Sequence, residues 1–158
     1  MEKAGIALLE AELLAQIGEI EGIFGKIEDR KRKKDKAAME SVGYQLHNLY
    51  CAFEDLFKIV ANSFENHIQD KSRYHQELLK RMTISIEGVR PGLLSHESFL
   101  LLDNLRSFRH FFRHAYSYEL DERKLQIVLE DASILKKIYR KDVDVFVKRF
   151  RSEQGKGG

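Results

Sequence analysis

Cysteine and proline are nearly absent from this sequence, and tryptophan is missing altogether. The chain has one cysteine, Cys51, and one proline, Pro91. A single cysteine excludes a disulfide within the chain and is typical of proteins that work in a reducing compartment. Because proline breaks helices, its scarcity leaves room for long ones. We therefore expect a fold without disulfides and with few interruptions.

Long apolar runs and a strong net charge are also lacking. No apolar stretch approaches the roughly 20 residues that span a bilayer. Acidic residues interrupt the N-terminal segment MEKAGIALLEAELL, which distinguishes it from a secretory signal. The 27 basic and 25 acidic residues give a formal charge of +2, so overall charge does not indicate a polyanion-binding protein. We expect a cytoplasmic protein that does not associate with membranes.

Apolar residues recur every three or four positions along most of the chain, which is the spacing of amphipathic helices. Strand-like alternation is confined to the short segment ISI at residues 84–86. Ser95 and Asp121 are expected to cap the helices that follow them, and Pro91 with Gly92 predicts a type II turn. The expected helices cover residues 3–31, 35–67, 72–86, 96–118 and 121 onward.

These helices and their short connections predict an all-α fold, an antiparallel bundle of four to five helices. The length is that of one domain. We assign residues 1–151 to a single helical domain and expect residues 152–158, SEQGKGG, to form a disordered tail.

The densest group of chemically active side chains lies in LRSFRHFFRHAYSYEL, at residues 105–120. In it, Arg109 is followed after four residues by His114, and Tyr116 lies two positions further on. Histidine takes up and releases protons near neutral pH, and arginine presents a planar fork to phosphate oxygens. Such a pair can cleave an RNA phosphodiester without metal, because the 2′-hydroxyl of the RNA is the nucleophile.

Helix geometry constrains how Arg109 and His114 act together. At about 100° per residue, their side chains lie roughly 140° apart around an undistorted helix. Three arrangements would bring them to one phosphate: a helix perturbed near Phe111, an Arg109 side chain that curls round the axis, or a cleft completed by a second copy of the chain. We favour the dimer, because it also supplies a second histidine.

Other residues near the motif have alternative interpretations. His110 and His114 are one turn apart, as metal ligands often are, but no carboxylate lies within that turn, and we expect no metal. The pair His47 and Cys51 supplies too few ligands for a metal site, and Cys51 suits a small core residue. Arg106 and Arg113 belong either to a solvated basic face or to an RNA-binding surface.

Two acidic residues on the second predicted helix also have alternative interpretations. Glu54 and Asp55 either accept hydrogen bonds from arginines of another helix or form a solvated acidic edge.

The segment RHFFRHAY at residues 109–116 resembles the Arg, four residues, His, one residue, Tyr signature of HepT-type toxins, a branch of the HEPN ribonuclease superfamily. The segment CAFED at residues 51–55 also resembles that family, and the similarity covers about residues 8–150. The resemblance implies a HEPN-like homodimer that acts as a metal-independent endoribonuclease without a cofactor. Arg109 and His114 of both subunits would line its cleft, and His110 would contact the substrate.

The resemblance also implies a partner. HepT-like toxins of bacterial toxin–antitoxin pairs are neutralised by MntA-like nucleotidyltransferase antitoxins, which bind them and transfer AMP to the tyrosine of the motif, here Tyr116. An added phosphate would compete for the arginine and block the cleft. The toxin would then be either a homodimer alone or part of a larger hetero-oligomer with antitoxin subunits. The alternative is a non-catalytic helical protein that only presents a binding surface to a nucleotidyltransferase.

Overall fold

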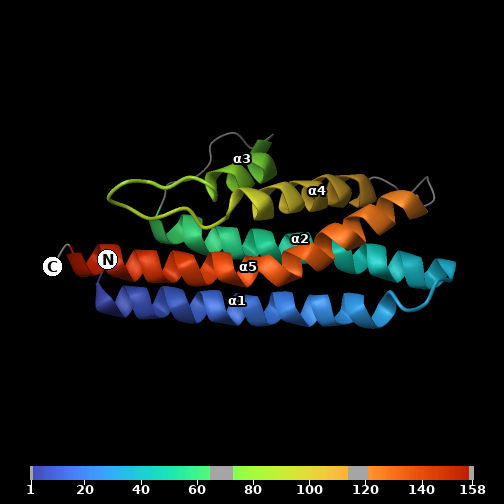
Figure 1. Cartoon of the computed structure of the whole chain (residues 1–158), viewed down its shortest axis with the longest axis horizontal. Coiled ribbons are helices and arrows are strands. Elements are labelled where there is room, and N and C mark those ends of the chain that lie inside the picture. Colours follow the sequence, from blue (N-terminus) through green and yellow to red (C-terminus); the bar gives the residue numbers. More distant parts are fainter. Residues whose placement is uncertain (1, 65–72, 114–120, 157–158) are drawn as a thin grey trace.

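The computed structural model describes residues 2–64, 73–113 and 121–156, and these form five helices with no extended sheet. The helices are α1 (Lys3–Arg30), α2 (Lys36–Phe64), α3 (Tyr74–Arg81), α4 (His96–Arg113) and α5 (Glu122–Lys156). The three long helices, α1, α2 and α5, lie side by side (Figure 1). Helix α4 runs along α2, and α3 lies beside the N-terminal half of α4. The predicted all-α bundle is confirmed.

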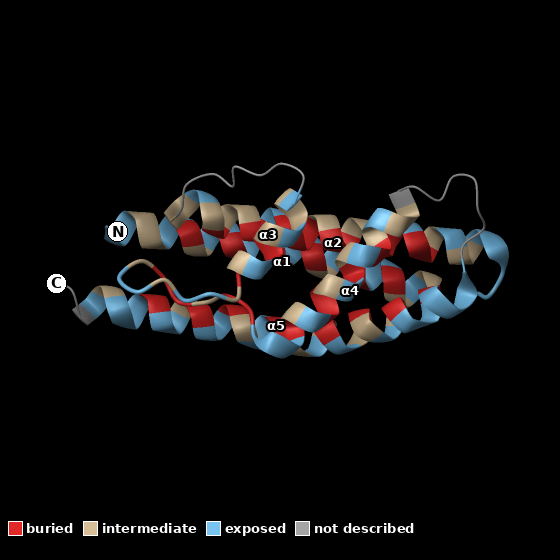
Figure 2. Cartoon of the chain, turned by 90° about the horizontal axis from the view of Figure 1, so that it is seen from above, coloured by how far each residue is buried: buried red, intermediate tan, exposed pale blue. Residues whose placement is uncertain are grey.

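The core forms where the apolar stripes of the helices meet, and these stripes face the interior of the bundle (Figure 2). Helix α2 is central, because it contacts all four other helices. Its buried surface is correspondingly broader than one stripe and includes Tyr50, Phe53 and Phe57, each with 0% exposure. The ring of Phe53 contacts those of Phe24 on α1 and Tyr139 on α5, which joins the three long helices.

The two predicted N-caps that begin α4 and α5 are confirmed. The Ser95 hydroxyl accepts a hydrogen bond from the Ser98 backbone N–H at 3.2 Å. The Asp121 carboxylate accepts one from the Arg123 backbone N–H at 2.9 Å. Each satisfies a backbone donor that has no partner within its helix. Ser95 also donates to Asp142 on α5 at 3.0 Å, so this cap fixes the start of α4 against its neighbour.

The loop between α3 and α4 differs from the prediction. Gly92 does not adopt the positive φ of a type II turn; the tight turn lies earlier, where Gly88 has φ 77° between Ile86 and Arg90. Gly92 instead approaches another part of the backbone, and a Cβ there would lie 3.0 Å from the Thr83 carbonyl oxygen. Sequence alone could not distinguish a glycine needed for space from one needed for its dihedral angle.

Arg90 holds this loop together from within. Its side chain is 1% exposed, and its guanidinium donates to the carbonyls of Ile84, Pro91 and Arg81 at 2.8, 3.0 and 3.1 Å. Arg81 is the last residue of α3, so the charge also lies at the end of a helix where cations are favoured.

The C-terminal boundary of the fold lies further along the chain than the sequence predicted. Helix α5 continues through residues 152–156, which we expected to be part of a disordered tail. No proline stops the helix, and the Arg151 guanidinium pairs with the Glu10 carboxylate of α1 just before these residues. The ion pair ties the end of α5 to the beginning of α1.

Across the described part of the chain, no helix combines the length and the apolar character needed to cross a membrane.

Candidate functional site

Arg109 is anchored across the interface between α4 and α2. It is half-buried, and its Nε–H donates to the Sγ atom of Cys51 on α2 at 3.4 Å. Its two Nη groups make no hydrogen bond or ion pair with any described residue. The guanidinium is therefore positioned by its inner nitrogen, and its two outer nitrogens form the planar fork that suits a phosphate.

Cys51 has a more specific environment than a small core residue. It is half-buried, and its sulfur accepts the hydrogen bond from Arg109. His47, one turn before it, lies against the Phe112 ring at a centroid distance of 5.7 Å. Within the described ranges, no three His, Cys, Asp or Glu side chains are grouped to hold a metal.

The other basic residues of α4 differ in their surroundings. Arg106 pairs with Asp103 one turn earlier, at 2.9 Å from both Nε and Nη2, and its side chain is 23% exposed. His110 is exposed. The Arg113 side chain lies outside the described residues. Arg106 thus has a structural partner, and its contact with RNA remains a prediction, as do those of His110 and Arg113.

His114 and Tyr116 both fall in residues 114–120, outside the described residues. The described part of α4 ends at Arg113, immediately before His114. The expected angle between Arg109 and His114, and the dimer inferred from it, therefore stay predictions.

Glu54 and Asp55 have different environments. Glu54 is buried, with 4% exposure, and its two carboxylate oxygens each lie 2.8 Å from Nδ1 of His75 on α3. Its hydrogen-bond partner is therefore a histidine instead of the arginine that we considered. The side chain of Asp55 is 61% exposed and lies 3.9 Å from Lys58, as expected of a solvated acidic edge.

The Tyr50 phenol on α2 interacts electrostatically with Glu54 and with the two arginines of α4, Arg106 and Arg109. Burial raises the pKa of its phenol, and the neighbouring charge of Glu54 raises the pKa further, while the charges of Arg106 and Arg109 oppose the shift. The phenol is thus neutral at physiological pH and lies within reach of all three charges. We call the group formed by Tyr50, Cys51, Glu54, His75, Arg106 and Arg109 the α2–α4 cluster.

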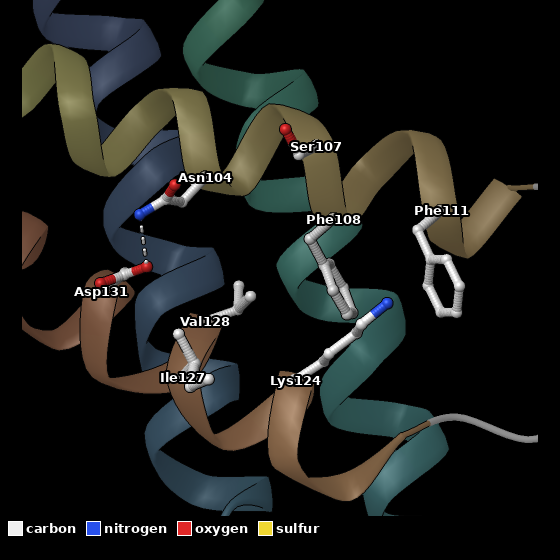
Figure 3. Close-up of a pocket in the computed structure, with 8 residues that line it drawn as sticks. All are labelled: Asn104, Ser107, Phe108, Phe111, Lys124, Ile127, Val128 and Asp131. Atoms are coloured by element: carbon white, nitrogen blue, oxygen red, sulfur yellow. Dashed lines mark hydrogen bonds between the residues drawn. The ribbon is translucent and has the colours of Figure 1, made fainter.

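A separate hollow lies between α4 and α5, on the flank of α4 turned away from Arg109. Its volume is about 270 Å³. Figure 3 shows Lys124 extending toward Phe111, and its Nζ lies 4.4 Å from the ring centroid. At the other end of the hollow, Asn104 donates to Asp131 at 3.0 Å. Burial raises the pKa of Asp131, and the Asn104 bond partly opposes this. The hollow shares no residue with the α2–α4 cluster.

His75 is the member of the cluster that sequence reasoning did not identify. It lies 21 residues after Glu54 and belongs to the short helix α3, so no spacing within one helix relates the two. Only the packing of α3 against α2 brings them together. A lone histidine beside aromatic residues gives no signal of such a partner.

Comparison with known proteins places the chain in a family. Searches of curated proteins and of solved structures gave no match. A sequence model for a family described as HepT-like protein matches residues 41–150, which are 110 of the 158 residues. The matched range contains the whole α2–α4 cluster and also His114 and Tyr116. Because the match covers more than half of the chain, the chain belongs to the HepT-like family of the HEPN superfamily.

Proposed function

We propose that this protein is the toxin of a bacterial toxin–antitoxin pair and cleaves RNA as a metal-independent endoribonuclease. The observation that carries the proposal is the Arg109, His114 and Tyr116 spacing within a chain of the HepT-like family. Proteins of the HEPN superfamily are generally ribonucleases. The anchoring of Arg109 on Cys51 supports a role in binding, because a preset guanidinium loses little freedom when it meets a phosphate.

Arg109 and His114 have complementary tasks in this mechanism. The 2′-hydroxyl of the RNA attacks the adjacent phosphorus as it loses its proton, and the bond to the 5′-oxygen breaks as that oxygen gains one. Arg109 stabilises the charge that builds on the phosphorane oxygens. His114 acts as general base or general acid, a task typically worth about 10² to 10⁴ in rate. His110, Arg106 and Arg113 contact the RNA around the cleaved bond.

The proposed active form is a homodimer with its cleft between the two motif-bearing helices. An undistorted helix would separate Arg109 and His114 by roughly 140°. A two-fold axis lets the arginine of one subunit and the histidine of the other face the same phosphate.

Cleavage of RNA by the purified protein should persist in EDTA, because no step uses a metal ion as Lewis acid or to activate water. The measurement is the rate of cleavage of a labelled RNA oligonucleotide, with the ends of the products identified. Attack by the 2′-hydroxyl should leave a 2′,3′-cyclic phosphate and a 5′-hydroxyl. Loss of cleavage in EDTA that zinc or magnesium restores would contradict the mechanism.

Tyr116 is the proposed target of a cognate MntA-like nucleotidyltransferase antitoxin. Incubation with that enzyme and ATP should add the mass of AMP to the wild-type chain and leave Tyr116→Phe unmodified, since the variant lacks the accepting hydroxyl. Intact-mass spectrometry is the measurement, and Tyr118→Phe is the matched control, which should still be modified. An adduct that persists on Tyr116→Phe would rule out this assignment.

A further inference from the structure

We propose that His75, held by Glu54, is a second acid–base group of the active site and takes the proton from the 2′-hydroxyl of the RNA. This inference rests on the proposed ribonuclease function and names the residue that performs one half of its proton transfer. Neither His75 nor Glu54 belongs to the motif at residues 109–116.

The contact between Glu54 and His75 fixes which nitrogen carries the proton. Nδ1 of His75 lies 2.8 Å from each carboxylate oxygen of Glu54. An ionised carboxylate can only accept hydrogen bonds, so the proposal assigns the proton to Nδ1. The other ring nitrogen, Nε2, is then an acceptor in the neutral ring, and it makes no hydrogen bond to any described residue. A carboxylate behind a histidine both orients the ring and stabilises the imidazolium that forms when Nε2 takes a proton.

The burial of the two side chains differs in the way this role requires. Glu54 is 4% exposed, which keeps its oxygens from being shared with water. The side chain of His75 is 42% exposed, so a substrate can reach it.

The anchor of the pair on α2 lies about one helical turn from the anchor of Arg109. Arg109 binds Cys51, and His75 binds Glu54, which is three residues further along α2. Side chains three residues apart on a helix are neighbours, with about 5–6 Å between their Cβ atoms. Arginine from α4 and histidine from α3 are therefore anchored on adjacent positions of one helix. The proposal therefore places a phosphate bound by Arg109 beside the His75 ring.

Positively charged side chains of α2 and α4 also lie near the Glu54–His75 pair. On α2, Lys58 Nζ lies 3.9 Å from Glu54 Oε1 and 5.8 Å from the centroid of the Tyr74 ring on α3. On α4, Arg106 and Arg109 carry positive charges that act on the buried phenol of Tyr50, one turn before Glu54 on α2.

The proton balance is complete with the groups already named. Neutral His75 accepts the 2′-hydroxyl proton on Nε2 as the 2′-oxygen bonds to phosphorus. Protonated His114 donates to the 5′-oxygen as the phosphorus–5′-oxygen bond breaks. The reaction leaves His75 protonated and His114 neutral, and exchange with water restores both.

The kinetic test compares wild type with His75→Gln on a labelled RNA oligonucleotide across pH. We expect kcat to fall by about 10²-fold or more with little change in KM, and the limb of the pH profile that reports the free base to disappear. His96→Gln is the matched control, because His96 is an exposed histidine at the start of α4. It should behave as wild type.

A spectroscopic test needs no catalysis. Long-range ¹H–¹⁵N spectra of the wild-type protein should show His75 protonated at Nδ1, and Glu54→Leu should shift the ring to the Nε2–H form that predominates in water. A wild-type ring protonated at Nε2 would overturn the inference even if a kinetic variant failed to fold. If His75→Gln kept the kcat and the pH dependence of wild type, the inference about His75 would be wrong and the proposed ribonuclease function would still stand. If the wild-type protein did not cleave RNA, the proposed function itself would be wrong.

Discussion

Arg109→Ala should lower kcat for RNA cleavage by about 10²- to 10³-fold, the usual effect of removing one group that stabilises developing negative charge. The variant should fold normally. The side chain is half-buried, and the hydrogen bond that it makes among the described residues, to a thiol at 3.4 Å, contributes little to stability. The measurements are steady-state kinetics on an RNA oligonucleotide and the midpoint of thermal unfolding.

Arg109→Lys separates charge from geometry at the same position. Lysine keeps the charge but lacks both the Nε–H that binds Cys51 and the planar fork that matches a phosphate. Its kcat should lie between those of wild type and Arg109→Ala. Cys51→Ala is the complementary control, because it removes the sulfur that accepts the hydrogen bond from Arg109 and leaves the arginine itself unchanged. Wild-type kcat in Arg109→Ala would show that this residue takes no part in the chemistry.

Phe53→Ala should lower the free energy of unfolding by about 3–5 kcal/mol, the range for removing a large aromatic side chain from a packed core. For a domain of this size, that corresponds to a fall of about 10 °C in Tm. The effect is large because Phe53 is fully buried and its ring contacts residues of both α1 and α5. Urea denaturation with a two-state fit measures it.

Leu100→Ala is the control for that substitution. Leu100 lies on α4 with 50% exposure, so its truncation should change stability by no more than about 0.5 kcal/mol. Equal destabilisation by the two variants would contradict the assignment of Phe53 to the centre of the core.

The helices could be predicted because their signals are local. The stripe of α1, from Leu9 to Ile27, and the caps Ser95 and Asp121 depend on residues within one or two turns. The loop before α4 could not, because its conformation depends on the burial of Arg90 and on the contact between Gly92 and Thr83. The end of α5 was missed because Arg151 finds its partner, Glu10, at the other end of the chain.

The candidate site also has a part that local sequence patterns predict and a part that depends on packing between distant segments. Arg109 stood out in the sequence because a short motif carries it. The contacts of Arg109 with Cys51 and of Glu54 with His75 join residues that are 58 and 21 positions apart in the sequence and lie on different helices. Which helices meet, and in which register, is decided by the packing of all the apolar stripes together, so neither contact follows from a local pattern.

The rate at which His114→Ala cleaves one defined RNA oligonucleotide in EDTA, relative to wild type, tests the central claim most directly. If His114 moves a proton in a metal-independent reaction, the variant should be slower by about 10² to 10⁴, and wild type should yield a 2′,3′-cyclic phosphate end. Equal cleavage by the two proteins would contradict the account, and would leave the chain as a helical partner that binds a nucleotidyltransferase without acting on RNA.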